Sequence, residues 1–233
     1  KEEASFTLSN HHKIHLHFCP SDDVFPKYWH EPNINVTYLA PHKRKIHALQ
    51  EATINSLQKY PQTILRYLNM IVFFRELKFY GLRYGGTYST HKGSIYIEHG
   101  HTDGFVEKVI HHEFSSMIIE EYGEDRLKRR WAKVLPPNFS YGTGGVDALR
   151  NNWTSTLDEK MWKKGLLSQY SGASFEEDFN VLAEQLWIGT DRLWQAAQQS
   201  KVIYDKLRIV MSVYAFFDQR CTESYFQGLR KYA

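Results

Sequence analysis

The feature that most constrains the fold is a change of hydrophobic periodicity along the chain. From Ser174 to the end, apolar residues recur at helical spacing, in segments such as SFEEDFNVLAEQLW and KVIYDKLRIVMSVYAFFDQ. Before residue 100, apolar residues instead alternate with polar ones or form short runs, as in strands. The sequence therefore predicts an α+β protein in which a small mixed sheet is followed by a mostly helical C-terminal lobe.

Three short stretches of the N-terminal half carry the strand signal, and a hairpin follows them. The hairpin consists of residues 84–89 and 94–98 around the turn His91-Lys92-Gly93, and we expect it at the edge of the sheet. Helical spacing of Ile46, Leu49, Ile54 and Leu57 predicts a helix between the second and third stretches. The three stretches are KIHLHF (13–18), INVTYL (34–39) and MIVFF (70–74).

A central helix separates the two halves. Thr102 or Asp103 can cap its start, and Gly123 follows its end at about Tyr122. A later helix starts at Ser174, because Ser174 and Glu177 form a capping box. We therefore expect lobes at 1–123 and 124–233 that together form one catalytic-type domain. An aromatic stripe in the second lobe is expected in its core: Trp187, Trp194, Tyr204, Tyr214 and Phe217.

Composition excludes some classes of function. A net charge of +3 over 233 residues is too small to indicate a nucleic-acid partner. No apolar run approaches the roughly 20 residues of a membrane span. The chain begins KEEASF without Met, which is compatible with a removed leader. Cys19 and Cys221 allow either a disulfide or two free buried thiols.

The stretch HHEFSS, within the central helix, carries the main chemical signal. A catalytic zinc takes three protein ligands, and two histidines at i and i+4 on one helix supply two of them. Here His112 can be the first ligand and Glu113 the general base, but Ser116 occupies the second-ligand position. A neutral hydroxyl is a poor ligand for zinc. We expect Glu177 as the third ligand and the Tyr170 phenol as a donor to a developing oxyanion.

Other interpretations of these residues stay open. His112 and Glu113 can be an ordinary polar pair, Glu177 can serve only the helix cap, and Tyr170 can be a packed aromatic. A replacement for the missing second histidine has four candidates in the sequence. They are His111, His99, His101 and a water held by Ser116.

Several motifs together resemble a known family. HHEF (111–114), GGTY (85–88), IYI (95–97) and GLLSQYSGASFEEDFNVLAE (165–184) are similar to motifs of zinc-binding metallopeptidases of the gluzincin type, in an extracytoplasmic lipoprotein-like group. The resemblance covers about residues 70–187 and implies a zincin-like fold. It implies zinc held by His112 and Glu177, with Glu113 as base. It also implies that Ile95, Tyr96 and Ile97 align a peptide or protein substrate by strand pairing.

The resemblance also implies an envelope, periplasmic or secreted location, with a lipid anchor lost together with the leader. Two positions depart from the family pattern: Ser116 replaces histidine, and Asn180 replaces a small alanine behind the third ligand. We therefore expect a zinc-dependent metallopeptidase with an atypical metal site. The alternatives are a non-catalytic zincin-fold binding protein that has lost its metal, and an unrelated helical binding or scaffold protein.

Overall fold

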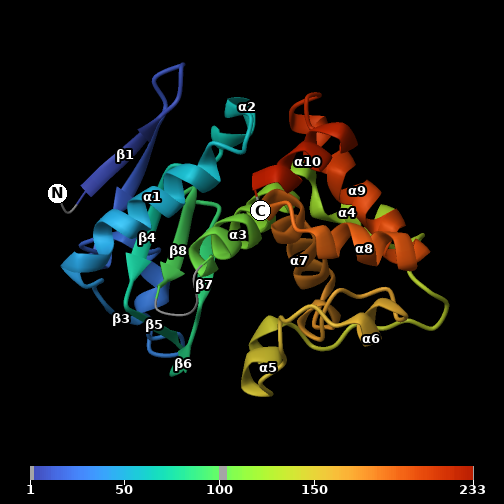
Figure 1. Cartoon of the computed structure of the whole chain (residues 1–233). Coiled ribbons are helices and arrows are strands. Elements are labelled where there is room, and N and C mark those ends of the chain that lie inside the picture. The colour runs from blue at the N-terminus through green and yellow to red at the C-terminus, as the bar shows by residue number, and fades with distance from the viewer. Residues whose placement is uncertain (1–2, 100–103, 233) are drawn as a thin grey trace. The chain divides into compact units, whose positions relative to one another are not determined.

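The computed structural model describes residues 3–99 and 104–232. The chain forms two compact units, Lys1–Met117 and Ile118–Ala233, and the boundary falls inside helix α3 (Phe105–Tyr122). Figure 1 shows the first unit in blue to green and the second in green to red. The sequence placed the boundary six residues later, at the end of this helix. The mixed sheet and the mostly helical second half confirm the predicted fold class.

Unit 1 is built on a five-stranded mixed sheet with the order β1-β2-β4-β8-β7. Strands β2, β4 and β8 run parallel, whereas β1 and β7 pair antiparallel with their neighbours. The predicted hairpin is present as β7 and β8, with Gly93 at φ +63° in its turn. The strand bounds are β1 Glu3–Thr7, β2 Lys13–His17, β4 Met70–Phe74, β7 Gly86–Ser89 and β8 Ser94–Glu98.

A second, three-stranded sheet has the order β3-β5-β6, with β3 Thr37–Leu39, β5 Glu76–Phe79 and β6 Leu82–Arg83. The buried Glu98 joins the two sheets of unit 1. Its carboxylate accepts hydrogen bonds from the Arg83 side chain at 2.8 Å and from the Leu77 N–H at 3.1 Å. This pairing explains how a carboxylate can lie fully buried at the end of β8.

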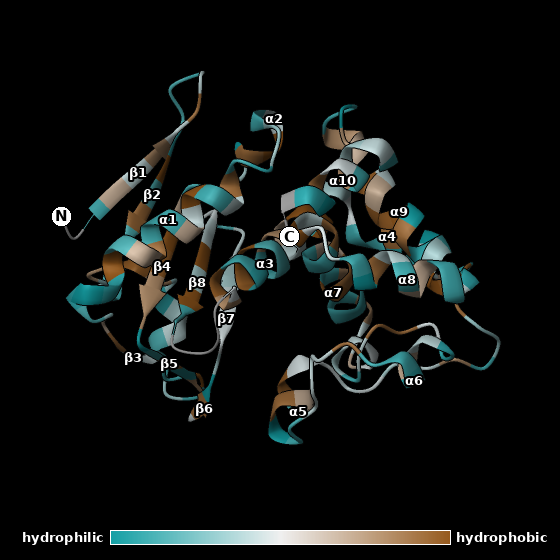
Figure 2. Cartoon of the chain, viewed as in Figure 1, coloured by the Kyte–Doolittle hydropathy of each residue, from teal (hydrophilic) through white to brown (hydrophobic). Residues whose placement is uncertain are grey.

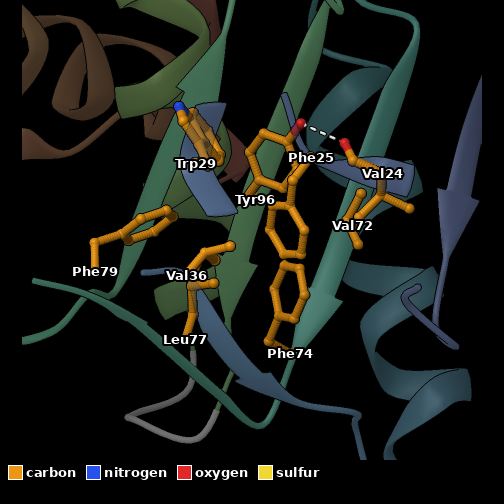
Figure 3. Close-up of a cluster of buried hydrophobic side chains, with 9 residues drawn as sticks. All are labelled: Val24, Phe25, Trp29, Val36, Val72, Phe74, Leu77, Phe79 and Tyr96. Atoms are coloured by element: carbon orange, nitrogen blue, oxygen red, sulfur yellow. Dashed lines mark hydrogen bonds between the residues drawn. The ribbon is translucent and has the colours of Figure 1, made fainter. Parts of the chain in front are cut away.

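One core cluster of unit 1 packs aromatic side chains against β4 and β8 (Figure 3). Phe25 stacks on both Phe74 and Tyr96, with ring centroids 5.5 and 5.3 Å apart. The Tyr96 hydroxyl donates to the Val24 carbonyl at 2.7 Å, so its polar end is satisfied inside the cluster. Helices α1 (Ile46–Leu57) and α2 (Gln62–Leu65) complete unit 1, along with the 3-10 turns Asp22–Val24, Lys27–His30 and Lys43–Lys45.

Unit 2 is helical, as the periodicity predicted, and Figure 2 shows that hydrophobic and hydrophilic residues are interspersed along its helices. Ser174 caps helix α7, because its hydroxyl accepts from the Glu177 N–H at 3.1 Å. Gly123, at φ +104°, separates α3 from the next helix. The helices after α3 are α4 Glu124–Ala132, α5 Gly145–Arg150, α6 Glu159–Trp162, α7 Phe175–Ile188, α8 Asp191–Gln199, α9 Lys201–Phe217 and α10 Glu223–Leu229. The 3-10 turns are Tyr170–Gly172 and Arg230–Tyr232.

The predicted aromatic core of unit 2 is only partly correct. Trp187, Trp194 and Tyr214 are buried, Phe217 is only half-buried, and Tyr204 is 36% exposed. Helical spacing alone misplaced Tyr204, because it lies on the outer edge of the face that α9 buries. Cys19 and Cys221 are free thiols, the first exposed and the second buried. Within the described residues, no helix is long and apolar enough to cross a membrane.

Candidate functional site

Helix α3 carries the His112, Glu113 and Ser116 positions of the predicted motif. His112 and Glu113 are half-buried, whereas Ser116 is only 2% exposed. His112 and Ser116 share one helix face because they are four residues apart. The second-ligand position of the pattern is therefore a buried hydroxyl on the same face as His112.

Strand β7 packs directly on this helix at Gly86. A Cβ atom at residue 86 would lie 2.4 Å from Val109 Cγ1 and 3.2 Å from Glu113 Oε1. Only a residue without a side chain permits this approach. The predicted general base thus lies beside the end strand of the five-stranded sheet.

The structure changes the assignment of the predicted substrate-aligning strand. Ile95, Tyr96 and Ile97 lie in β8, an interior strand. Each of them is paired with β4 on one side and with β7 on the other, for example Tyr96 with Val72 and Thr87. An added peptide strand needs an unpaired sheet edge, so it cannot pair with these residues. At this end of the sheet the edge strand is β7.

His111, the first candidate to replace the missing histidine, makes hydrogen bonds to other side chains through its ring nitrogens. Its side chain is fully buried. Nδ1 lies 2.7 Å from the Tyr60 hydroxyl, and Nε2 lies 3.1 Å from Glu107 Oε1. Nε2 donates to the carboxylate, and Nδ1 shares a hydrogen bond with the phenol. Both ring nitrogens are therefore engaged: Nδ1 ties α3 to Tyr60, and Nε2 bonds to Glu107 within α3 itself.

Glu107 extends this network to Lys59, whose ammonium lies 2.5 Å from the same carboxylate oxygen. Burial alone would raise the pKa of Glu107, but the hydrogen bonds and charges of His111 and Lys59 outweigh burial and hold this pKa below its usual 4.5. The charged carboxylate is thus the stable form near neutral pH.

His99, the second candidate, follows β8 and is 6% exposed. Burial lowers the pKa of His99, and the nearby charges of Lys45 and His42 act in the same direction, so the ring is neutral. Within the described residues, no group of three or more His, Cys, Asp or Glu side chains is placed to hold a metal ion. His99 therefore does not complete such a group, and His101 lies outside the described residues.

Unit 2 brings together two of the predicted site residues. A Cβ atom at Gly145 would lie 2.7 Å from Glu177 Oε1 and 2.9 Å from the Tyr170 hydroxyl. Both side chains are half-buried and converge on this glycine. The predicted third ligand and the predicted oxyanion donor are thus neighbours, although they are seven positions apart in sequence.

The loop before Gly145 is fastened next to this pair by backbone hydrogen bonds. The Gly142 N–H donates to the Gly172 carbonyl at 2.8 Å, and the Gly144 N–H donates to the Ala173 carbonyl at 2.9 Å. The 3-10 turn that begins at Tyr170 and the start of α7 therefore lie against the glycine-rich loop segment 142–145.

A buried network anchors the same loop, and no sequence pattern predicted it. The Tyr141 hydroxyl donates to Asp178 Oδ2 at 2.5 Å and accepts from the Trp131 indole at 2.8 Å. The Lys206 ammonium lies 2.6 Å from the same carboxylate oxygen, and both charged groups are buried. Asp178 directly follows Glu177, so the network fixes the first turn of α7. Its one sequence signal was a charged residue, Lys206, inside an apolar helix face.

His112 and Glu177 belong to different units. That they share one metal therefore stays a prediction.

Comparison with known proteins places the fold. No family model and no curated protein matches the chain. A crystal structure from Bacteroides caccae, described as a "putative zinc-binding metallo-peptidase", is 16% identical in sequence. It matches with a TM-score of 0.56 over 84% of this chain and 78% of that chain. The chain shares the fold of that protein.

Zinc binding is described for that protein, but the donors of α3 in this chain do not fit a catalytic zinc site. Such a site needs three protein ligands, and the helix normally contributes two of them. Here it contributes His112 alone, because Ser116 is a neutral buried hydroxyl and both nitrogens of His111 are engaged.

Proposed function

We propose that this protein is a metallopeptidase-fold binding protein that holds extended peptide segments against β7 without a complete zinc site. The observation that carries the proposal is the buried Ser116 at the second-ligand position, next to a His111 with both nitrogens engaged. Strand β7 supports the peptide class of ligand, because it is the end strand of the sheet and lies beside Glu113.

A peptidase is the second candidate, and the pair in unit 2 favours it. Glu177 and Tyr170 converge at Gly145, as a metallopeptidase of the gluzincin type would require of its third ligand and oxyanion donor. In this candidate Glu113 serves as the base in hydrolysis of a peptide bond. The Bacteroides caccae protein, which shares the fold, is described with the same class of activity.

The first test is the zinc content of the full chain, purified without added metal or a nickel-binding tag. We expect far less than one zinc per chain by elemental analysis. Binding of unstructured fluorescent peptides should be saturable and unchanged by a chelator. One zinc per chain, together with chelator-sensitive cleavage of those peptides, would establish the peptidase instead.

A matched pair of variants tests the geometry of α3. Ser116→His restores the i, i+4 histidine pair and should raise zinc affinity at least tenfold, since a second imidazole joins the coordination. Ser115→His places the same bulky side chain one position away and should leave zinc affinity unchanged. Thermal unfolding of both variants shows whether they fold. If both variants fold and bind zinc with equal affinity, the helix face that carries His112 and Ser116 is not the face of a metal site.

The resemblance of the motifs further supports an extracytoplasmic location, which we propose for the mature protein. Fractionation of the source cells with an antibody against this chain tests it. Recovery in the envelope or in the medium is expected, and recovery in the cytoplasm alone would refute it.

A further inference from the structure

Three helices of unit 2 border a cavity of about 320 Å³ that the proposed peptide-binding role does not use. Helix α8 contributes Trp194, Ala197 and Gln198, which share one face because they are spaced i, i+3 and i+4. Helix α10 contributes Glu223 and Gln227, again four residues apart. The residues that line the cavity thus come mainly from α8, α9 and α10, whose ribbons Figure 1 shows.

The inner wall of the cavity is apolar and aromatic. Trp194 is 5% exposed, and the small Ala197 beside it leaves room for a ligand. The Trp194 indole N–H is buried and has no acceptor among the described residues. On the outer side, Tyr204 is 36% exposed, although helical spacing predicted it to be in the core. The Arg208 guanidinium lies over one face of its ring, 6.0 Å from the centroid. An exposed aromatic at a cavity mouth offers a flat apolar face with a polar tip.

The rim of the cavity is polar, and the arginine that lines it, Arg230, is engaged in an ion pair. The Arg230 guanidinium donates to Asp191 Oδ1 at 2.7 Å and to Gln227 Oε1 at 3.0 Å. The ion pair with Asp191 offsets the charge of Arg230, and the second bond orients the Gln227 amide. Gln198 adds a second amide, and Glu223 adds hydrogen-bond acceptors. The carboxylate of Glu223 disfavours an anionic ligand.

We propose that this cavity binds one unit of a neutral sugar. A pyranose has an apolar C–H face that fits against an aromatic ring, and hydroxyl groups that pair with amides and carboxylates at its rim. The volume is at the lower end of the range of about 300–1,000 Å³ for small-molecule sites, which suits a single hexose. This binding is independent of the peptide site proposed above.

The test is a titration of the full chain with D-glucose, D-galactose, D-mannose and N-acetylglucosamine, followed by tryptophan fluorescence and calorimetry. At least one of these sugars should bind saturably. Gln198→Ala should weaken that binding about tenfold, because a hydrogen bond to the ligand is lost. Gln199→Ala is the matched control, since Gln199 is an exposed neighbour on α8 that does not line the cavity.

Two variants of Tyr204 separate ring stacking from hydrogen bonding. Tyr204→Ala should abolish most of the affinity, whereas Tyr204→Phe should keep most of it. Peptide binding should be unchanged in all these variants, so failure of the sugar site is distinct from failure of the peptide site. The proposal is overturned if none of the four sugars binds or if Gln198→Ala and Gln199→Ala weaken binding equally. Tighter binding of glucuronate than of glucose would also overturn it.

Discussion

The part of helix α3 that belongs to unit 1 and the start of helix α7 in unit 2 carry the two halves of one predicted sequence pattern. They differ in how completely they match it. On α3 the second histidine is replaced by the buried Ser116, and the adjacent His111 is engaged by Tyr60 and Glu107. At α7, Glu177 and Tyr170 still converge on Gly145, and a buried ion pair anchors the turn. One region therefore keeps the side-chain arrangement that the pattern predicts, while the other departs from it in residue type.

The largest expected effect tests the anchor of α7. Lys206→Met should destabilise the chain by about 3–5 kcal/mol, because it leaves the buried carboxylate of Asp178 without its cation. Lys201→Met is the matched control on the same helix. Lys201 is 85% exposed and pairs with Asp205, so its loss should cost less than about 0.5 kcal/mol. Chemical denaturation measures the free energy of unfolding of both variants. Similar losses of stability would show that the buried pair of Lys206 and Asp178 stabilises the fold no more than an exposed ion pair.

Two glycine substitutions compare the regions directly. Gly86→Ala should cost about 1–3 kcal/mol, because the new Cβ would lie 2.4 Å from Val109 on a packed helix. At Gly145 the new Cβ would meet only the ends of the Glu177 and Tyr170 side chains, which can rotate. Gly145→Ala should therefore lower the free energy of unfolding by less than about 1 kcal/mol, while it displaces the Glu177 and Tyr170 side chains. Denaturant titration ranks the two variants, and the reverse ranking would contradict this account of the packing.

The effect of Glu107 on stability should depend on pH. The folded pKa of Glu107 lies below its usual 4.5, so its charge contributes stability above about pH 4.5 and loses that contribution as pH falls through the folded pKa. Glu107→Gln should cost about 1 kcal/mol at pH 7, and the difference from the wild type should vanish at low pH. Urea titrations of the wild type and the variant from pH 7 to pH 3 measure this difference in the free energy of unfolding. A constant difference over this range would show that the charge of Glu107 is not involved.

Hydrophobic periodicity and turn residues were sufficient to predict most of the secondary structure. Alternation predicted β2, the apolar run predicted β4, and the glycine after His91-Lys92 predicted the β7–β8 hairpin. These signals succeed because they depend on neighbours in sequence. The order of strands in a sheet does not depend on sequence neighbours. The sequence therefore placed the substrate-aligning edge strand at Ile95–Ile97, whereas these residues lie in β8, which is an interior strand. Tyr204 was misplaced for a similar reason, since burial of one helix face depends on its packing partners.

Residue type and local spacing were enough to predict the class of fold, the central helix with His112 and Glu113, and the serine at the second-ligand position, Ser116. The tertiary structure alone decided that His111 is committed to Tyr60 and Glu107, and that Glu177 meets Tyr170 at Gly145. It also decided that Asp178 and Lys206 form a buried pair. Such contacts join residues distant in sequence, and their partners are selected by burial and geometry, which one-dimensional spacing does not encode.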